Sequence, residues 1–280
     1  MAITSPFVTT DWLAEHLGDP DVVPVDASWY LPTATRNARA EYLASHLPGA
    51  VFFGIDDIAD RSTDLPHMLP LPEQFGAQVG ALGIAATDTI VVYDETGLFS
   101  APRVWWTFRV MGARDVRILA GGGPKWRAEG RPTEAGESRR KPQMFDAAYD
   151  PRPVANLLQM RQYVEARSRT LVDARPAARY RGEVPEPRPS RHLGHIPGAR
   201  NVPYSELTDE RGVLKPAEAL RAIFAREGVA LDRPIVTYCG TGVTAAILAL
   251  ALETAGATQV AVYDGSWAEW GNRDDTPVER

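Results

Sequence analysis

Short, mostly apolar runs alternate along the chain with longer stretches whose apolar residues recur at helical spacing. In the second half, residues 170–173, 235–238 and 260–263 have the length and composition of buried strands. Residues 216–227 have the pattern of an amphipathic helix, and residues 243–255 form an apolar, alanine-rich stretch that favours a buried helix. Alternation of strands and helices predicts a parallel sheet with helices on both faces.

The same order of segments occurs twice, at separations of 144 to 149 residues. The pairs are Val25-Asp26-Ala27 with Val172-Asp173-Ala174, His46-Leu47-Pro48-Gly49-Ala50 with His195-Ile196-Pro197-Gly198-Ala199, Ile90-Val91-Val92-Tyr93 with Ile235-Val236-Thr237-Tyr238, and Trp126 with Trp270. Each copy has the size of an ordinary domain. Residues 131–153 are rich in Pro, Glu, Arg and Ser and lack a sustained period, which is typical of a linker. We therefore expect two α/β domains, residues 1–145 and 146–280.

Composition limits the classes of function. Apolar residues make up 44% of the chain and charged residues 24%, which is ordinary for a globular protein. The net charge of -6 gives no electrostatic reason to expect binding to nucleic acid or to an anionic membrane, and no apolar run has the length of a membrane span. The first residues do not resemble a secretory signal. A single cysteine excludes an internal disulfide and a zinc site built from several cysteines, and we expect a cytoplasmic protein because a reducing compartment fits this composition.

That cysteine, Cys239, lies where reactive groups gather in α/β proteins. The strand predicted at residues 235–238 delivers it to the carboxyl edge of the sheet. Gly240 and Gly242 allow the following backbone to curl so that successive N–H groups converge, and the next helix adds its own unpaired N–H groups. Both effects favour a thiolate. The alternative is a buried structural cysteine, but strand, glycines and helix start together favour the reactive interpretation.

The loop Cys239-Gly-Thr-Gly-Val-Thr-Ala245 resembles the active-site loop of two-domain sulfurtransferases, the family of rhodanese and 3-mercaptopyruvate sulfurtransferase. Further segments match in the same order: Asp26-Ala-Ser-Trp-Tyr30, His67-Met-Leu-Pro70, Ser100-Ala-Pro-Arg-Val-Trp-Trp106, Pro185-Glu-Pro-Arg188, Gly194-His-Ile-Pro-Gly198 and Tyr263-Asp-Gly-Ser-Trp267. The resemblance implies tandem rhodanese-like domains, each a parallel sheet flanked by helices. It also implies an inactive first domain, a catalytic second domain, a cysteine persulfide intermediate and no requirement for a metal or an organic cofactor.

The residues after the cysteine separate the two branches of this family. Members that prefer thiosulfate tend to have basic residues there, whereas members that prefer 3-mercaptopyruvate tend to have Gly-Ser-Gly or Gly-Thr-Gly. Gly240-Thr241-Gly242 therefore resembles the mercaptopyruvate branch. We expect the N–H groups from Gly240 to Gly242, and those of Val243 and Thr244, to stabilise the charge of the persulfide. Thiosulfate:cyanide sulfurtransferase is the alternative function.

Two arginines are candidates for binding the donor. Arg179 and Arg188 lie nine residues apart, and a guanidinium binds a carboxylate through two parallel hydrogen bonds. They match the arginines that bind the substrate carboxylate and carbonyl in the mercaptopyruvate branch. The alternative is that both are solvated surface charges, which is what we expect of Arg175, Arg181 and Arg191.

Two further residues are candidates through the resemblance. It implies that Thr241 helps to polarise or protonate the substrate, although its hydroxyl could equally bond to its own backbone. His46 lies in a His-x-Pro-Gly-Ala turn, where a structural role is the simplest. The resemblance suggests that His46 faces the active site across the domain interface, but a nearby position that is often Asp in the family is Asn37 here.

Two more rivals remain. A cysteine phosphatase needs an arginine six residues after its cysteine, where this chain has Ala245. A binding module without activity usually loses the cysteine, as the first copy has done by placing Asp94 there. We therefore predict a sulfurtransferase that moves sulfur from 3-mercaptopyruvate through a Cys239 persulfide and releases pyruvate. The acceptor is cyanide, a small thiol or a protein thiol such as that of thioredoxin.

Overall fold

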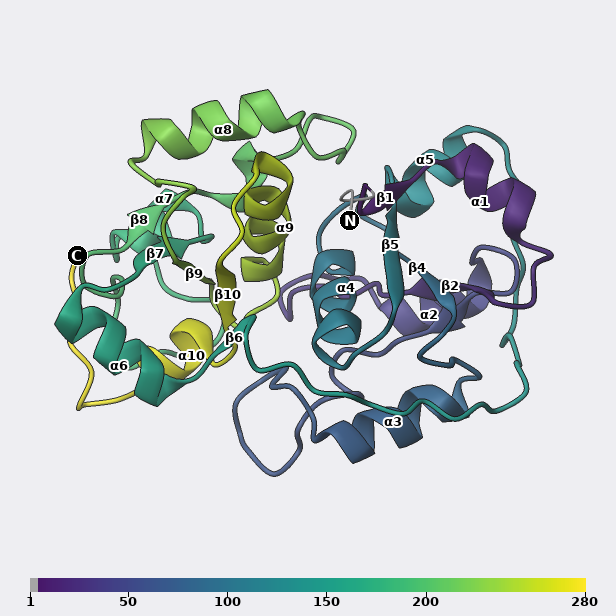
Figure 1. Cartoon of the computed structure of the whole chain (residues 1–280), viewed down its shortest axis with the longest axis horizontal. Helices are drawn as coiled ribbons and strands as arrows, with labels where there is room; N and C mark the ends of the chain where they lie inside the picture. The colour runs from purple at the N-terminus through teal and green to yellow at the C-terminus, as the bar shows by residue number, and fades with distance from the viewer. Residues whose placement is uncertain (1–4) are drawn as a thin grey trace. The chain divides into compact units, whose positions relative to one another are not determined.

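The computed structural model describes residues 5–280, which divide into two compact units. Among the described residues, the first unit comprises residues 5–60, Leu69–Asp150 and Glu210–Val213, and the second comprises Arg61–Met68, Pro151–Asp209 and Leu214–Arg280. Each unit contains one five-stranded sheet (Figure 1). The main division falls between residues 150 and 151, where we expected it between 145 and 146, and each unit includes one short segment from the other half of the sequence.

The first unit has a parallel sheet in the order β1-β5-β4-β2-β3. Its strands are β1 (Phe7–Val8), β2 (Val22–Asp26), β3 (Val51–Phe52), β4 (Thr89–Tyr93) and β5 (Asp115–Leu119). Its helices are α1 (Thr10–His16), α2 (Ala38–Ala44), α3 (Pro72–Ala81), α4 (Ala101–Val110) and α5 (Gly122–Ala128).

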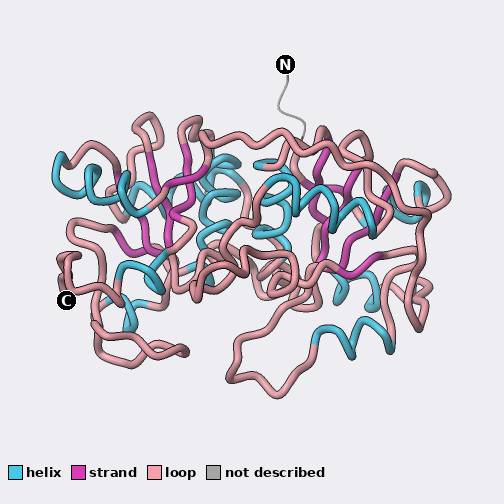
Figure 2. Tube along the Cα trace, turned by 90° about the horizontal axis from the view of Figure 1, so that it is seen from below, coloured by secondary structure: helices cyan, strands magenta, loops and turns pink. Residues whose placement is uncertain are grey.

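The second unit repeats this topology in the order β6-β10-β9-β7-β8, also entirely parallel. Its strands are β6 (Val154–Ala155), β7 (Thr170–Asp173), β8 (Arg200–Asn201), β9 (Ile235–Tyr238) and β10 (Val260–Tyr263). Its helices are α6 (Leu157–Ala166), α7 (Ala177–Tyr180), the 3-10 turn η1 (Tyr204–Glu206), α8 (Ala217–Arg226), α9 (Ala245–Ala255) and α10 (Ser266–Trp270). In both units the strands form a central layer with helices around it (Figure 2), which confirms the predicted fold class.

The repeated sequence segments have a shared structural purpose. Tyr93 ends β4 and accepts the N–H of Leu47 at 3.2 Å through its phenol oxygen, and Tyr238 ends β9 and accepts the N–H of Ile196 at 3.2 Å. Each tyrosine therefore ties one His-x-Pro-Gly-Ala turn to the end of a central strand.

The predicted linker is bound to the first unit. The N–H of Gln143 donates to the carbonyl of Gly80 at 2.9 Å, and the ring of Phe145 meets that of Phe75 edge-on, with centroids 5.3 Å apart. A Cβ at Gly76 or at Gly80 would lie 2.5 Å from a backbone oxygen of this segment, so both positions need glycine. The segment is thus irregular in backbone, and residues 143–147 pack against α3.

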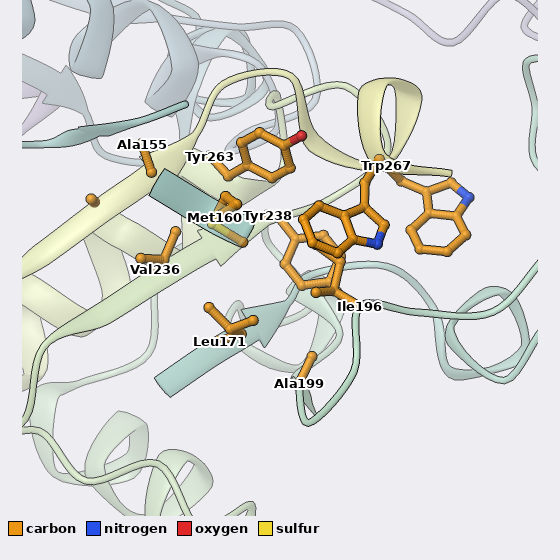
Figure 3. Close-up of a cluster of buried hydrophobic side chains, with 11 residues drawn as sticks. Ala155, Met160, Leu171, Ile196, Ala199, Val236, Tyr238, Tyr263 and Trp267 are labelled. Carbon is orange, nitrogen blue, oxygen red and sulfur yellow. The ribbon is translucent and has the colours of Figure 1, made fainter. Parts of the chain in front are cut away.

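The core of the second unit fixes the strand that precedes Cys239. The buried cluster of Figure 3 consists of Ala155, Met160, Leu171, Ile196, Ala199, Val236, Tyr238, Ala261, Tyr263, Trp267 and Trp270. Helix α9 is buried along nearly its whole length, as its alanine and leucine content predicts. Because strand and helix are both packed, the loop between them is held at both ends. None of the described helices is long and apolar enough to cross a membrane.

A buried carboxylate ends the same strand in each unit, but its surroundings differ. Asp173 at the end of β7 is fully buried and receives Arg175 Nη2 at 2.7 Å and Nε at 3.1 Å. In the first unit Ser28 takes the place of Arg175, and Asp26 accepts the N–H of Ser28 at 2.9 Å. Burial raises the pKa of Asp26, and hydrogen bonds from Ser28 oppose the rise.

Arg175 itself corrects our expectation of a solvated surface charge. Its side chain is 1% exposed, it stacks 4.5 Å from the ring of Trp267, and it donates to the carbonyl of Gly194 at 2.7 Å. Burial alone would lower the pKa of this guanidinium, but the Asp173 carboxylate outweighs burial, so the pKa is raised. The prediction failed because the sequence does not show that β7 places a carboxylate two residues away in the interior.

We predict that Asp26→Asn makes stability less dependent on pH. A carboxyl whose pKa is raised by folding stabilises the protein below its unfolded pKa, and that contribution is lost as the pH rises through the folded value. The free energy of unfolding should be measured by urea denaturation from about pH 4 to about pH 8. We expect the value for Asp26→Asn to exceed that for the wild type, and we expect the difference to grow as the pH rises. Exposed Asp21→Asn is the control, and parallel curves for wild type and Asp26→Asn would contradict the assignment.

Arg175→Met should destabilise the second unit strongly, because it leaves Asp173 buried without its cation. Breaking a buried pair costs about 3–5 kcal/mol. The matched control is Arg181→Met, whose ion pair with Glu183 has both side chains 52% exposed and should contribute less than about 1 kcal/mol. Equal losses in urea unfolding of the two variants would show that the Asp173–Arg175 pair is not a stabilising element.

Candidate active site

Cys239 follows β9 directly and is 2% exposed. Its N–H donates to Ser266 Oγ at 3.2 Å, and its carbonyl accepts the N–H of Trp267 at 2.9 Å. The carbonyl of Gly240 accepts the N–H of Ala268 at 2.8 Å. The first two residues of the loop are therefore bound to α10, which fixes the backbone on which the thiol sits.

Ser266 is a component of this site that sequence reasoning missed. Its φ is 50°, a left-handed conformation that non-glycine residues seldom adopt. Its hydroxyl donates to the carbonyl of Tyr263 at 2.8 Å and accepts the N–H of Cys239. The strained backbone thus brings a hydroxyl under the cysteine. The available signal was the pair Gly265 and Ser266 shortly after β10.

The N–H groups that follow Cys239 have no acceptor. From Gly240 to Ala245 none of them donates to another residue in the part of the chain that the structure describes. Gly242 has a φ of 81°, which turns the chain towards α9 and requires glycine. Thr244 caps α9 without a side-chain hydrogen bond, so the helix start also keeps its donors. Successive free N–H groups and a helix N-terminus make a place for an anion.

The equivalent loop of the first unit binds a carboxylate. Asp94 follows β4 as Cys239 follows β9, and its carboxylate accepts hydrogen bonds from the loop that leads to α4. The donors, at 2.7 to 2.9 Å, are the N–H groups of Thr96, Phe99, Ser100 and Ala101 and the hydroxyl of Thr96. The residue after the strand therefore places its own negative charge among these donors. Cys239 occupies the same position in the second unit. We therefore infer that the free N–H groups of its loop suit an anion on the side chain of Cys239.

Arg179 lies against this loop. A Cβ added to Gly240 would be 2.9 Å from Arg179 Nη2, so the glycine leaves room for the guanidinium. Arg179 Nε lies 3.1 Å from both carboxylate oxygens of Glu186, and Nη2 donates to Glu186 Oε2. The structure brings Arg179 to the cysteine loop, but with one edge already bound to a protein carboxylate. Its contact with a substrate stays a prediction.

Arg188 differs from Arg179 in having no partner. It is half-buried, follows Glu186 by two residues, and makes no hydrogen bond or ion pair with any residue between 5 and 280. A guanidinium without a protein acceptor is available for a ligand carboxylate. Its role in binding also stays a prediction.

The other predicted site residues of the loop are all at least half-buried. Thr241 is half-buried and its hydroxyl makes no hydrogen bond to another described residue, so it is not occupied by its own backbone. Gly242 and Val243 are buried, and Thr244 is half-buried. Their predicted contacts with substrate are not tested by this arrangement.

His46 is engaged within the first unit. It is 1% exposed and stacks on Tyr42 with ring centroids 4.1 Å apart. Its Nδ1 donates to the carbonyl of Tyr42 at 2.7 Å, and its Nε2 lies 3.0 Å from Ser138 Oγ. These contacts account for His46 as a structural residue, and its interdomain role stays a prediction. A different histidine of the first half, His67, belongs to the unit that carries Cys239 and is 4% exposed.

Tyr204 is a further group that sequence reasoning did not find. It begins η1 after β8, and burial raises its pKa while the charge of Arg179 opposes the rise. Cys239 raises it further, so the phenol lies within electrostatic range of both groups. No pattern in the sequence around Tyr204 distinguishes it from a core tyrosine.

Comparison with known proteins agrees with this geometry. The rhodanese-like domain model matches the chain twice, at residues 9–129 and 154–273. The 3-mercaptopyruvate sulfurtransferase of Escherichia coli K12 is 46% identical over 277 residues, covering 99% of this chain and 98% of the relative. The thiosulfate sulfurtransferase of Rattus norvegicus is 43% identical over 273 residues, covering 95% and 92%.

A solved structure gives the same result. The crystal structure of SseA from Escherichia coli, described as a 3-mercaptopyruvate sulfotransferase with the rhodanese fold, has a TM-score of 0.88 and 44% identity. The match covers 95% of this chain and 100% of that one. Two repeated parallel sheets, a cysteine at the end of the second central strand, and full-length similarity at this level lead to one conclusion. The chain belongs to the rhodanese-like family and contains two rhodanese-like domains.

Proposed function

We propose that this chain is a sulfurtransferase that takes sulfur from 3-mercaptopyruvate onto Cys239 and passes it to an acceptor. The observation that carries the proposal is the row of N–H groups from Gly240 to Ala245, which has no acceptor among the described residues and follows the only cysteine. The equivalent donors of the first unit hold the Asp94 carboxylate. Relatives named 3-mercaptopyruvate sulfurtransferase, 46% identical from Escherichia coli and 41% identical from Homo sapiens, support the same reaction.

The first half-reaction charges the cysteine. The Cys239 thiolate attacks the thiol sulfur of 3-mercaptopyruvate, so that an S–S bond forms and the C–S bond breaks. The electron pair of the C–S bond stays on carbon as the enolate of pyruvate, which takes the proton of the transferred sulfur and leaves as pyruvate. The outer sulfur of the persulfide then carries the negative charge that the loop N–H groups stabilise. Thr241, with a free hydroxyl beside Gly240, is the candidate for assisting the proton transfer.

The second half-reaction restores the thiolate. A nucleophile such as cyanide or a thiolate attacks the outer sulfur, the S–S bond breaks, and its electron pair returns to Cys239 Sγ. The acceptor can be a small thiol or the thiol of a protein such as thioredoxin. The first half-reaction requires a reduced Cys239 and the second regenerates it, which fits our placement of the protein in the cytoplasm.

The donor is assigned from the loop and not from overall similarity. Identity to the mercaptopyruvate enzyme of Escherichia coli is 46% and to the thiosulfate enzyme of Rattus norvegicus 43%, too close to separate the donors. Gly240-Thr241-Gly242 adds no cation for a dianion such as thiosulfate. Arg188 without a protein partner suits the single planar carboxylate of 3-mercaptopyruvate.

We predict that the intact mass of the protein rises by one sulfur atom on incubation with 3-mercaptopyruvate and returns to its original value on addition of a reducing thiol. Cys239→Ser should fold, gain no mass and release no pyruvate, because a hydroxyl cannot hold a transferable sulfur. A Cys239→Ser protein that still transfers sulfur would refute the mechanism.

We also predict a higher kcat/KM with 3-mercaptopyruvate than with thiosulfate when cyanide is the acceptor. Arg188→Lys keeps the charge and removes the two-point fork, so it should lower kcat/KM for 3-mercaptopyruvate by roughly ten- to a hundredfold and lower that for thiosulfate less. Arg191→Lys, at an exposed arginine paired with Asp274, is the control. A wild-type preference for thiosulfate would replace this assignment by thiosulfate:cyanide sulfurtransferase.

A further inference from the structure

A chain of alternating charges runs from the central sheet to the cysteine loop. Asp173 pairs with Arg175 at 2.7 Å, Arg175 pairs with Glu186 Oε1 at 2.7 Å, and Glu186 pairs with Arg179. Arg179 in turn lies against Gly240. The first two side chains are at most 1% exposed, that of Glu186 is 7% exposed and that of Arg179 17%. Arg179, the cation next to the loop, is therefore held in place through Glu186 and Arg175 by Asp173 at the end of β7.

Glu186 is the member on which the position of Arg179 depends. Its Oε1 receives Arg175 Nη1, and both of its oxygens receive the Nε edge of Arg179. This bidentate contact fixes which edge of the guanidinium is occupied. Nη1 of Arg179 makes no hydrogen bond with the described residues, and it is the end left for a ligand.

Glu186 also sets the charge of the site. The two carboxylates and two guanidinium groups of the chain balance, so Arg179 reaches the loop as part of a neutral set. Arg188 then remains as the one cation of this segment without a carboxylate among residues 5–280. Without Glu186 the site would carry one more positive charge, and the attraction of a donor with two negative charges would rise more than that of a donor with one.

The first unit lacks the counterpart of the Asp173–Arg175 pair. Ser28 occupies the position of Arg175, and its hydroxyl accepts the N–H of Glu95. In the part of the chain that the structure describes, no arginine therefore connects the end of β2 to the loop after β4. The charge network occurs in the unit that has the cysteine.

We propose that Glu186 is the residue that sets donor selectivity, by holding one edge of Arg179 and cancelling its charge so that a monoanionic 2-oxo acid is favoured over dianionic thiosulfate. This inference rests on the proposed function, since it concerns the two donors of that reaction. Glu186 acts through Arg179 and is a positioning residue.

The test compares Glu186→Gln with the wild type, using thiocyanate formation from cyanide so that both donors give the same measured product. Glutamine keeps the shape and an oxygen acceptor but removes the charge. The ratio of kcat/KM for thiosulfate to that for 3-mercaptopyruvate should rise on the order of tenfold, and the rise should shrink as salt is added. Glu183→Gln is the matched control, because Glu183 pairs with Arg181 on the same segment in an exposed position.

Glu186→Asp provides the second variant, since it keeps the charge and shortens the side chain. Its donor ratio should stay within about twofold of the wild type even where both rates fall. A tenfold shift in Glu186→Asp, or an unchanged ratio in a folded Glu186→Gln protein, overturns the inference. If Glu186→Gln lowers kcat/KM equally for both donors and the effect does not depend on salt, Glu186 has a structural role only and the inference is wrong.

The two proposals fail separately. A wild-type protein that makes thiocyanate from neither donor and gains no sulfur mass contradicts the proposed function. A wild-type protein that uses 3-mercaptopyruvate, together with a donor ratio that ignores the charge at position 186, contradicts the role of Glu186 alone.

Discussion

An amide N–H that leaves water without gaining an acceptor costs free energy. Directly after β9 the chain has a row of N–H groups, in buried and half-buried residues, that have no acceptor among residues 5–280. In the first unit the cost is removed internally, because the Asp94 carboxylate accepts hydrogen bonds from its own loop. In the second unit the same position holds Cys239, whose neutral thiol is a poor acceptor. In the proposed reaction, the persulfide of Cys239 with charge on its outer sulfur supplies the missing anion. The proposed intermediate is thus the state that gives these N–H groups an acceptor.

The two units share one layout and differ at a small number of positions near the ends of their central strands. Strand order, the tyrosine that ties down the His-x-Pro-Gly-Ala turn, and the aspartate at the end of β2 or β7 are common to both. The differences lie at the residue after the central strand and at the partner of the aspartate. Both positions are buried in the second unit, and Arg175 contacts Trp267 of its apolar cluster, so each copy has its own set of partners around the same strand ends.

The fold could be predicted because its signals are local and repeated. Strand–helix alternation and the two copies of Val-Asp-Ala and His-x-Pro-Gly-Ala required no knowledge of distant contacts. Cys239 and the turn allowed by Gly240 and Gly242 were also visible, since a cysteine between a strand, two glycines and a helix start is typical of a reactive thiol. Arg175 was misjudged because its burial depends on Asp173, Trp267 and Gly194, which only folding brings together. Ser266 escaped notice for the same reason.

For Arg179 the sequence indicates the residue but not its hydrogen-bond partners. The sequence indicated a guanidinium near the donor, and the structure brings it to the loop. What the sequence could not show is that Glu186 already binds one edge of it and that Glu186 is itself held by a buried arginine. Burying four charges in a row gives little net stability, since desolvation offsets most of their attraction. The value of such a network therefore lies in the charge and orientation that it sets at Gly240, more than in its contribution to folding.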